Sequence, residues 1–172
     1  MAGKNKKEAV DKFAGYIRES LSSISEAYVL VYQASANIFK IFYEQPVRLN
    51  SEEGLYLFSV VQICSALEDA KYGGFKATTR NYSYTLIRVP IEGEPEEVLS
   101  YHWHPDDSAL RDPHLHLGCI PRIHFPTSRV CLEDVVVMLI KYYGIVPQLA
   151  HSEWTRILEK NKRAFNRMAT WK

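Results

Sequence analysis

The spacing of apolar residues changes at Gly73–Gly74, from the repeat of a helix to the alternation of a strand. Before this point Val10, Phe13 and Ile17 recur every three or four residues, as they do along one face of a helix. After it, residues 75–89 are rich in Thr, Tyr and Ile, which favour strands. A chain that contains both periods predicts helices packed on a sheet rather than a helical bundle.

The part of the chain before the change predicts three helices, over residues 10–24, 26–43 and 50–72. Asn50 resembles an N-cap, and Gly73–Gly74 closes the third helix. A hairpin is the alternative for residues 26–43, because aromatic and β-branched residues abound there. We favour a helix, since the segment between the two halves lacks an Asn-Gly or Asp-Gly turn.

The remainder predicts a sheet followed by two helices. Residues 75–89 and 98–104 read as antiparallel strands joined by an acidic loop, and HLHLG and RIHFP as two shorter strands. Helical spacing returns over 132–143, where Gly144 is placed as a C-cap, and over 152–168. The predicted fold class is α+β, with N-terminal helices and two C-terminal helices packed on a small, mainly antiparallel sheet. The 172 residues form a single domain, with residues 1–7 as a disordered basic tail.

Several classes of protein are disfavoured. The chain has three cysteines and no C-x-x-C pair, so neither a disulfide framework nor a thiolate zinc site is expected. It has no apolar run long enough to cross a bilayer and no secretory leader at its N-terminus, which predicts a cytoplasmic protein without a membrane partner. No feature predicts the oligomeric state.

Five of the six histidines are concentrated in one segment bounded by prolines. They are His102, His104, His114, His116 and His124. Residues i and i+2 of a strand share a face, so two His-x-His pairs on neighbouring strands bring four imidazoles to one surface. His124 can arrive from the next strand. Histidine titrates near neutral pH and is the commonest metal ligand, so the cluster is the candidate site.

Three roles are open for this cluster. In a metal site, His102, His104, His114 and His116, together with Asp112, would bind a divalent ion such as zinc, iron or manganese. In a metal-free catalytic site, drawn from the five histidines and Arg129, one neutral histidine acts as base and one protonated histidine as acid. Arg129 or Arg111 then stabilises a transferring phosphoryl group. In the third role the histidines are structural members of the sheet.

The last predicted helix carries a basic stripe. Arg156, Lys160, Arg163 and Arg167 share one face, although the net charge of the whole chain is only +1. Four cations in line can follow the phosphates of RNA, or they can form a solvated helix face. We favour the solvated face.

The motifs YHWHP, PHLHLG and HxPTxRVxLEDVV occur in this order, and with them residues 80 to 172 resemble a family of uncharacterised small bacterial proteins. The chain has Ser128 and Cys131 where that family often has Gly and Ser, and Cys131 is a poorer N-cap. More distantly, a sheet that ends in a Pro- and His-rich segment is similar to TumE-type toxins of bacterial toxin–antitoxin pairs. That resemblance implies action on RNA, and no catalytic residue is carried over from it.

Two functions follow as hypotheses. The first is a small bacterial hydrolase, a nuclease or phosphodiesterase acting on RNA, with the histidine cluster as its acid–base or metal centre. The second is a non-catalytic binding protein, either one partner of a toxin–antitoxin or defence-type pair or a metal-binding module, in which the histidines position a ligand or a protein partner. Carboxylates close to the imidazoles would favour metal chemistry.

Overall fold

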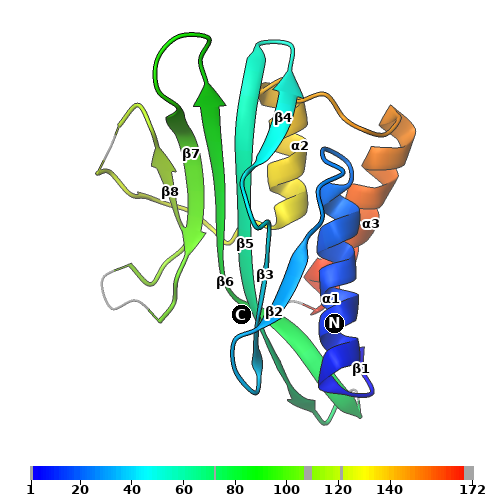
Figure 1. Ribbon diagram of the computed structural model, residues 1–172. Helices are drawn as coiled ribbons and strands as arrows, with labels where there is room; N and C mark the ends of the chain where they lie inside the picture. Colours follow the sequence, from blue (N-terminus) through cyan, green and yellow to red (C-terminus); the bar gives the residue numbers. More distant parts are fainter. Residues whose placement is uncertain (1, 72, 107–109, 121, 169–172) are drawn as a thin grey trace.

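Among the residues that the structure describes, three helices pack on a mainly antiparallel sheet (Figure 1). The computed structural model describes residues 2–71, 73–106, 110–120 and 122–168. The α+β class is therefore confirmed. The helices are α1 (Lys6–Leu21), α2 (Leu132–Tyr142) and α3 (His151–Met168). The strands are β1 (Ala2–Gly3), β2 (Leu30–Gln33), β3 (Ile38–Phe42), β4 (Val47–Ser51), β5 (Gly54–Asp69), β6 (Gly74–Val89), β7 (Glu96–Trp103), β8 (His114–Leu117) and β9 (Phe125–Pro126).

The described strands form one sheet in the order β2-β3-β5-β6-β7-β8-β9. In addition, β4 pairs with β5 and β1 pairs with β6. All these pairings are antiparallel. The sheet is therefore much larger than the small sheet predicted from the sequence.

The prediction of a helix over residues 50–72 is wrong, because this segment contains the end of β4, the turn that follows it and the whole of β5. Residue 72 lies outside the described residues. Tyr56, Phe58 and Val60 are buried in strand alternation. The residues between them are also largely apolar and half-buried on the other face, so the run mimics a helical repeat. Asn50 pairs with Leu55 across the β4–β5 hairpin and caps no helix.

The prediction of a helix over residues 26–43 is also wrong, and the alternative hairpin is correct. β2 pairs with β3 in register from Leu30–Phe42 to Gln33–Phe39. The connection closes with a hydrogen bond from the Ala34 amide to the Ile38 carbonyl, 2.9 Å long. A longer loop thus replaces the two-residue turn whose absence had favoured a helix.

Residues 2–7 belong to the fold rather than to a disordered tail, and residue 1 lies outside the described residues. Ala2 and Gly3 pair with β6. Asn5 caps α1 by accepting a hydrogen bond from the Glu8 amide (2.9 Å), and Glu8 accepts one from the Lys4 amide (2.8 Å). The Asn5 side chain thus satisfies one of the free amides of the first turn, and the Glu8 carboxylate ties the residue before the N-cap to the helix.

A buried polar network joins the three helices. Ser20 of α1 donates to the Glu133 carboxylate of α2 (2.8 Å), and the Asn161 amide of α3 donates to Ser20 (3.0 Å). Burial raises the pKa of Glu133, and the hydrogen bond from Ser20 opposes this rise. Because an unpaired polar group is costly in a core, this network selects one arrangement of the helices.

Gly118 ends β8 at a point where the backbones of β7 and β8 approach closely. A Cβ atom there would lie 1.6 Å from the Glu97 carbonyl oxygen. The Gly118 amide donates to the Val98 carbonyl (3.1 Å), so the contact holds the end of β8 against β7. Only glycine fits this approach.

We predict that Gly118→Ala lowers the free energy of unfolding by about 1–3 kcal/mol, since the backbones must separate. The matched control is Gly15→Ala in the middle of α1, where a Cβ meets nothing within 4 Å. That change raises stability by about 0.5–1 kcal/mol through helix propensity. Urea denaturation measures both, and equal stability of Gly118→Ala and the parent protein would refute the close approach.

Candidate metal centre

The pairing of β7 with β8 brings the histidines together. His102 lies directly opposite His114, and Ser100 opposite His116. Residues directly opposite in an antiparallel pair share a face, so His102, His114 and His116 project from one side of the sheet. His104 follows β7 immediately and continues its alternation.

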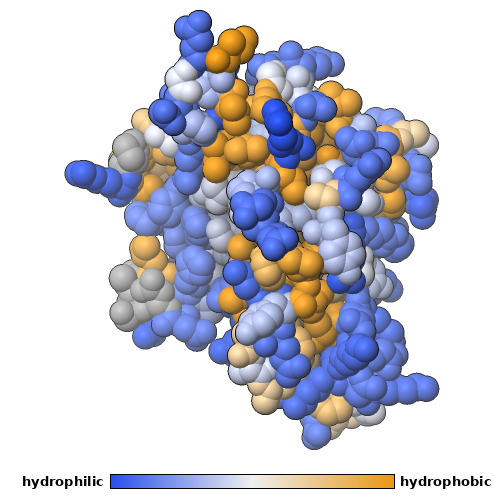
Figure 2. All heavy atoms as spheres, viewed as in Figure 1, coloured by the Kyte–Doolittle hydropathy of each residue, from blue (hydrophilic) through white to orange (hydrophobic). Residues whose placement is uncertain are grey.

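The other side of β7 faces the helices. Tyr101 contacts Met138 of α2, with its hydroxyl 3.8 Å from the sulfur, and Trp103 is buried against Tyr82. The histidines therefore lie on the face that α2 does not cover. Polar residues gather on the left of Figure 2, where β7 and β8 lie in Figure 1.

His124 joins the cluster from the segment just before β9. The register of β8 and β9 pairs His114 with Pro126 and Leu115 with Phe125. One more step along the same register places His124 opposite His116, and their ring centroids are 4.2 Å apart. The expectation that His124 arrives from the next strand along the chain is thus close to the observed position.

All five imidazoles lie within a small volume. The ring centroids of His102 are 5.0 Å from His116 and 5.7 Å from His114, and His114 is 5.1 Å from both His116 and His124. One ligating nitrogen each from His114, His116 and His124 lies within 4.8 Å of the other two. These three side chains are close enough to share one metal ion.

A hydrogen bond to the backbone prepares one of these rings, His114, as a ligand. His114 Nδ1 is 2.9 Å from the Asp112 carbonyl oxygen, which can only accept, so this nitrogen carries the proton and Nε2 keeps its lone pair. Metal-binding histidines commonly have such a backbone partner. The Nδ1 atom of His124 is buried without a hydrogen-bond partner among the described residues.

The electrostatics favour the neutral imidazole at His102 and His116. Burial, together with the repulsion from positive charge on His116, His104, His114 and His124, lowers the pKa of His102 to about 4. Burial also lowers the pKa of His116, with a smaller contribution from His124 and His114. Neutral imidazole is the form that binds metals.

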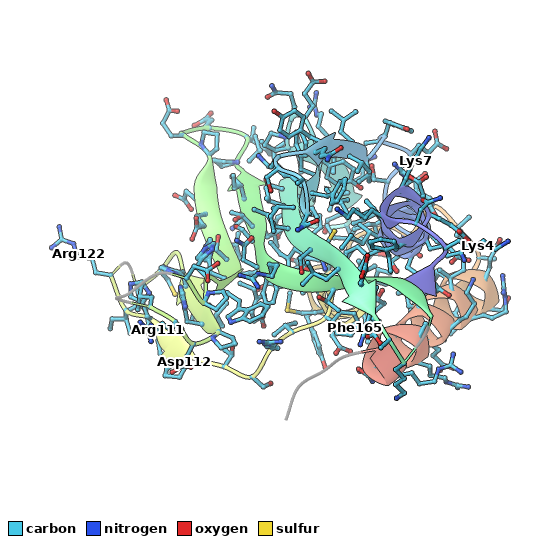
Figure 3. The ribbon with its side chains drawn as sticks, turned by 90° about the horizontal axis from the view of Figure 1, so that it is seen from below. Lys4, Lys7, Arg111, Asp112, Arg122 and Phe165 are labelled. Atoms are coloured by element: carbon cyan, nitrogen blue, oxygen red, sulfur yellow. The ribbon has the colours of Figure 1, made fainter. Side chains whose placement is uncertain are left out.

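Other predicted site residues lie outside this group. Asp112 flanks β8 with Arg111 (Figure 3), and it contributes its carbonyl to His114. Its carboxylate is not part of the three-ligand group found among the described residues. The Arg129 guanidinium stacks 3.4 Å from the centre of the Trp103 ring, a side chain on the opposite face of β7 from His102. The structure therefore does not bring Arg129 into the cluster.

A pocket of about 920 Å³ adjoins the cluster at His116. Arg88, Glu97, Cys119, Tyr142 and Tyr143 are among its lining residues. They come from β6, β7, the segment after β8 and the end of α2. The sequence did not predict this pocket, since no local motif links segments so far apart in the chain.

The predicted basic stripe lines a surface groove along α3. Lys160 pairs with Glu19 (2.6 Å) and Arg163 with Glu159 (3.1 Å), so two of its four cations have acidic partners. In Figures 1 and 3, α3 lies on the right of the molecule and β8 on the left. The stripe and the histidine cluster therefore occupy opposite sides of the protein.

Comparison of the chain with protein-family models, curated proteins and solved structures finds no significant match in any of the three. Across the described part of the chain, no helix has the length and apolar character needed to span a membrane.

We predict that the metal-free protein loses stability as the pH falls from about 6.5 to about 4, in part through His102. The folded protein lowers the pKa of His102 from 6.5 to about 4, so the unfolded chain binds the extra proton in this window. The contribution of neutral His102 to the stability of the fold is therefore complete above about pH 6.5. It is lost as the pH falls to about 4. One such proton changes the free energy of unfolding by up to about 1.4 kcal/mol per pH unit.

Urea denaturation in the presence of a chelator measures this effect. His102→Gln flattens the pH dependence, whereas His151→Gln, which changes the one histidine on α3, does not. Identical pH profiles for His102→Gln and the parent protein would show that the cluster does not disfavour protonation of His102.

Proposed function

We propose that this protein is a metal-dependent hydrolase that cleaves a phosphodiester bond, with RNA as its substrate. The observation that carries the proposal is the convergence of His114, His116 and His124, whose nitrogens lie within 4.8 Å of one another. Three protein ligands leave a coordination position open, as in catalytic rather than structural zinc sites.

The ligand set favours zinc among the ions expected from the sequence. Imidazole suits zinc well, whereas manganese prefers sites rich in carboxylates, and non-haem iron typically adds a carboxylate to two histidines. Bound zinc lowers the pKa of a coordinated water to about 7 and so supplies a nucleophile near neutral pH.

The pocket beside the histidine cluster supports hydrolysis of a substrate of the size of a small molecule or of one residue of a polymer. The pocket next to His116 is of a size that holds a small molecule or one residue of a polymer. Arg88 in its wall can pair with a phosphate, and Tyr142, which is 78% exposed, can stack on a base. In this proposal Arg88 and Tyr142 bind and orient the substrate, and the histidines hold the metal ion.

Metal-free acid–base catalysis is the weaker form of this proposal. It requires one histidine of the cluster to be protonated near neutral pH. Burial and neighbouring imidazoles lower the pKa values of His102 and His116, which works against that requirement for both.

A non-catalytic metal-binding module is the second candidate function. The observation that favours it is that the three-ligand group among the described residues contains no carboxylate that could act as a general base. Zinc binding without hydrolysis of any phosphodiester would select this candidate. The cytoplasmic location and a protein partner of the toxin–antitoxin type stay predictions from the sequence.

We predict that the protein binds one zinc ion tightly and that His116→Ala or His124→Ala abolishes this binding. Elemental analysis after dialysis against limiting zinc measures the occupancy. The control His151→Ala keeps full occupancy. Each cluster variant unfolds in chelator at nearly the same denaturant concentration as the parent protein, because functional groups rarely contribute to stability.

The same preparations test hydrolysis. Cleavage of a labelled single-stranded RNA and of bis(p-nitrophenyl) phosphate is expected with zinc, absent in His116→Ala and abolished by chelator. Zinc retained by both alanine variants would contradict the proposed site, and zinc-loaded protein without cleavage would leave only the metal-binding module.

We predict a separate effect of the basic face of α3 on RNA affinity. Arg156 and Arg167 are exposed and have no ion pair among the described residues, so they are the cations to remove. If both contact phosphates, Arg156→Ala with Arg167→Ala reduces the slope of log affinity against log salt by about 1.4 for a single strand.

The matched control for α3 is Lys162→Ala, since Lys162 pairs with Asp134. Binding of labelled RNA across a salt series decides between the two interpretations of this face. An unchanged slope in the double variant, or no RNA binding by the parent protein, makes the stripe a solvated helix face.

A further inference from the structure

We propose that His102 and His104 hold a second divalent transition-metal ion beside the first. The inference rests on the proposed metal site and extends it from one ion to two. It concerns two histidines that lie outside the group formed by His114, His116 and His124.

The separation of two ring nitrogens carries this inference. His104 Nε2 lies 3.3 Å from His102 Nδ1. Zinc–imidazole bonds of about 2.0–2.1 Å at a tetrahedral angle place two ligating nitrogens roughly 3.3–3.4 Å apart. The pair is thus spaced as two ligands of one ion. The separation is long for a hydrogen bond, since an N–H donor usually lies about 2.7–3.2 Å from its acceptor.

The backbone holds the pair in this position. His102 is the penultimate residue of β7, paired with Ser83 of β6 on one side and His114 of β8 on the other. His104 stands two residues further along, so both side chains project from the same face. A shift of the tautomer of one ring frees both facing nitrogens, and no net proton has to leave.

The two subsites are adjacent but separate. His124 lies against His116, with ring centroids 4.2 Å apart, and marks the first subsite. The ring of His102 lies 5.0 Å from His116 and 5.7 Å from His114, which places its subsite on the other side of these two rings. A second cation next to the first can bind an oxygen of the same phosphoryl group.

The second ion binds more weakly than the first, for two reasons. It has two protein ligands rather than three, with water completing its coordination. It also meets the positive charge of the first ion, and like charges at this distance repel. We expect dissociation constants that differ by at least tenfold.

Titration of the metal-free protein with Zn²⁺ by calorimetry, with Co²⁺ absorption as a second readout, tests the proposal. The parent protein is expected to bind two ions in a tight and a weak step. His104→Gln, and His102→Gln with His104→Gln, retain the tight step and lose the weak one. His124→Ala loses the tight step, and His151→Gln retains both steps.

The outcomes separate this inference from the proposed function. Saturation of the parent protein at one ion, or a weak step that survives the double variant, overturns the second subsite and leaves the first intact. Loss of both steps in His104→Gln also overturns it, since the pair would then belong to a single site. A tight step that survives His124→Ala overturns the first site instead. Far-UV circular dichroism and urea denaturation show whether each variant is folded.

Discussion

The long antiparallel pairing of β5 with β6 forms the centre of the sheet, and the other strands and the helices pack around it. Each strand has 16 residues, and their register runs from Leu55–Val89 to Asp69–Gly74 with one irregularity near Ile63. On its other edge β5 pairs with β3 and β4. On its other edge β6 pairs with β7 and, at its start, with β1. The helix-facing side of the two strands buries Phe58, Val60, Tyr84 and Leu86, on which the helical layer packs. Because hydrogen bonds satisfy both edges of each central strand, this ladder determines where every peripheral strand lies.

The candidate metal centre is a consequence of register. The pairing of β6 with β7 places His102 opposite Ser83, and the pairing of β7 with β8 places His114 opposite His102. The pairing of β8 with β9 then places His124 one residue beyond its last pair. A slip of one residue in any of these pairings would turn the imidazoles toward the helices and Leu115 or Trp103 outward. The burial of Trp103 and Leu99 therefore stabilises the register in which the histidines lie on one face. Gly118 permits the close backbone contact that ends β8 at the required point.

The two faces of the sheet at β7 differ in how their polar side chains are satisfied. On the helix side, Arg129 covers Trp103, and the network of Ser20, Glu133 and Asn161 satisfies a carboxylate whose pKa burial has raised. On the other side, five imidazoles stand close together, and the pKa of His102 falls to about 4. A group of neutral nitrogen bases held close together gains from a shared cation, whereas added protons repel one another. This is the physical reason why we propose a metal centre rather than an acid–base site.

Local patterns in the sequence were enough to predict the α+β class, the helices α1, α2 and α3 and the strands β6, β7 and β8. They also predicted that His102, His104, His114 and His116 share one face. These features depend on local periodicity and on the period of two in a strand, which do not require knowledge of distant residues. Contacts between distant segments were needed to show that β2, β3 and β5 are strands, because their apolar residues lie on both faces and local spacing is then ambiguous. The tertiary structure also decided that His124 completes the three-ligand group, that Arg129 stacks on Trp103 away from it, and that α3 lies on the far side of the molecule. These outcomes depend on which strand edges pair and which faces are buried, and such contacts between distant segments leave no pattern in the local sequence.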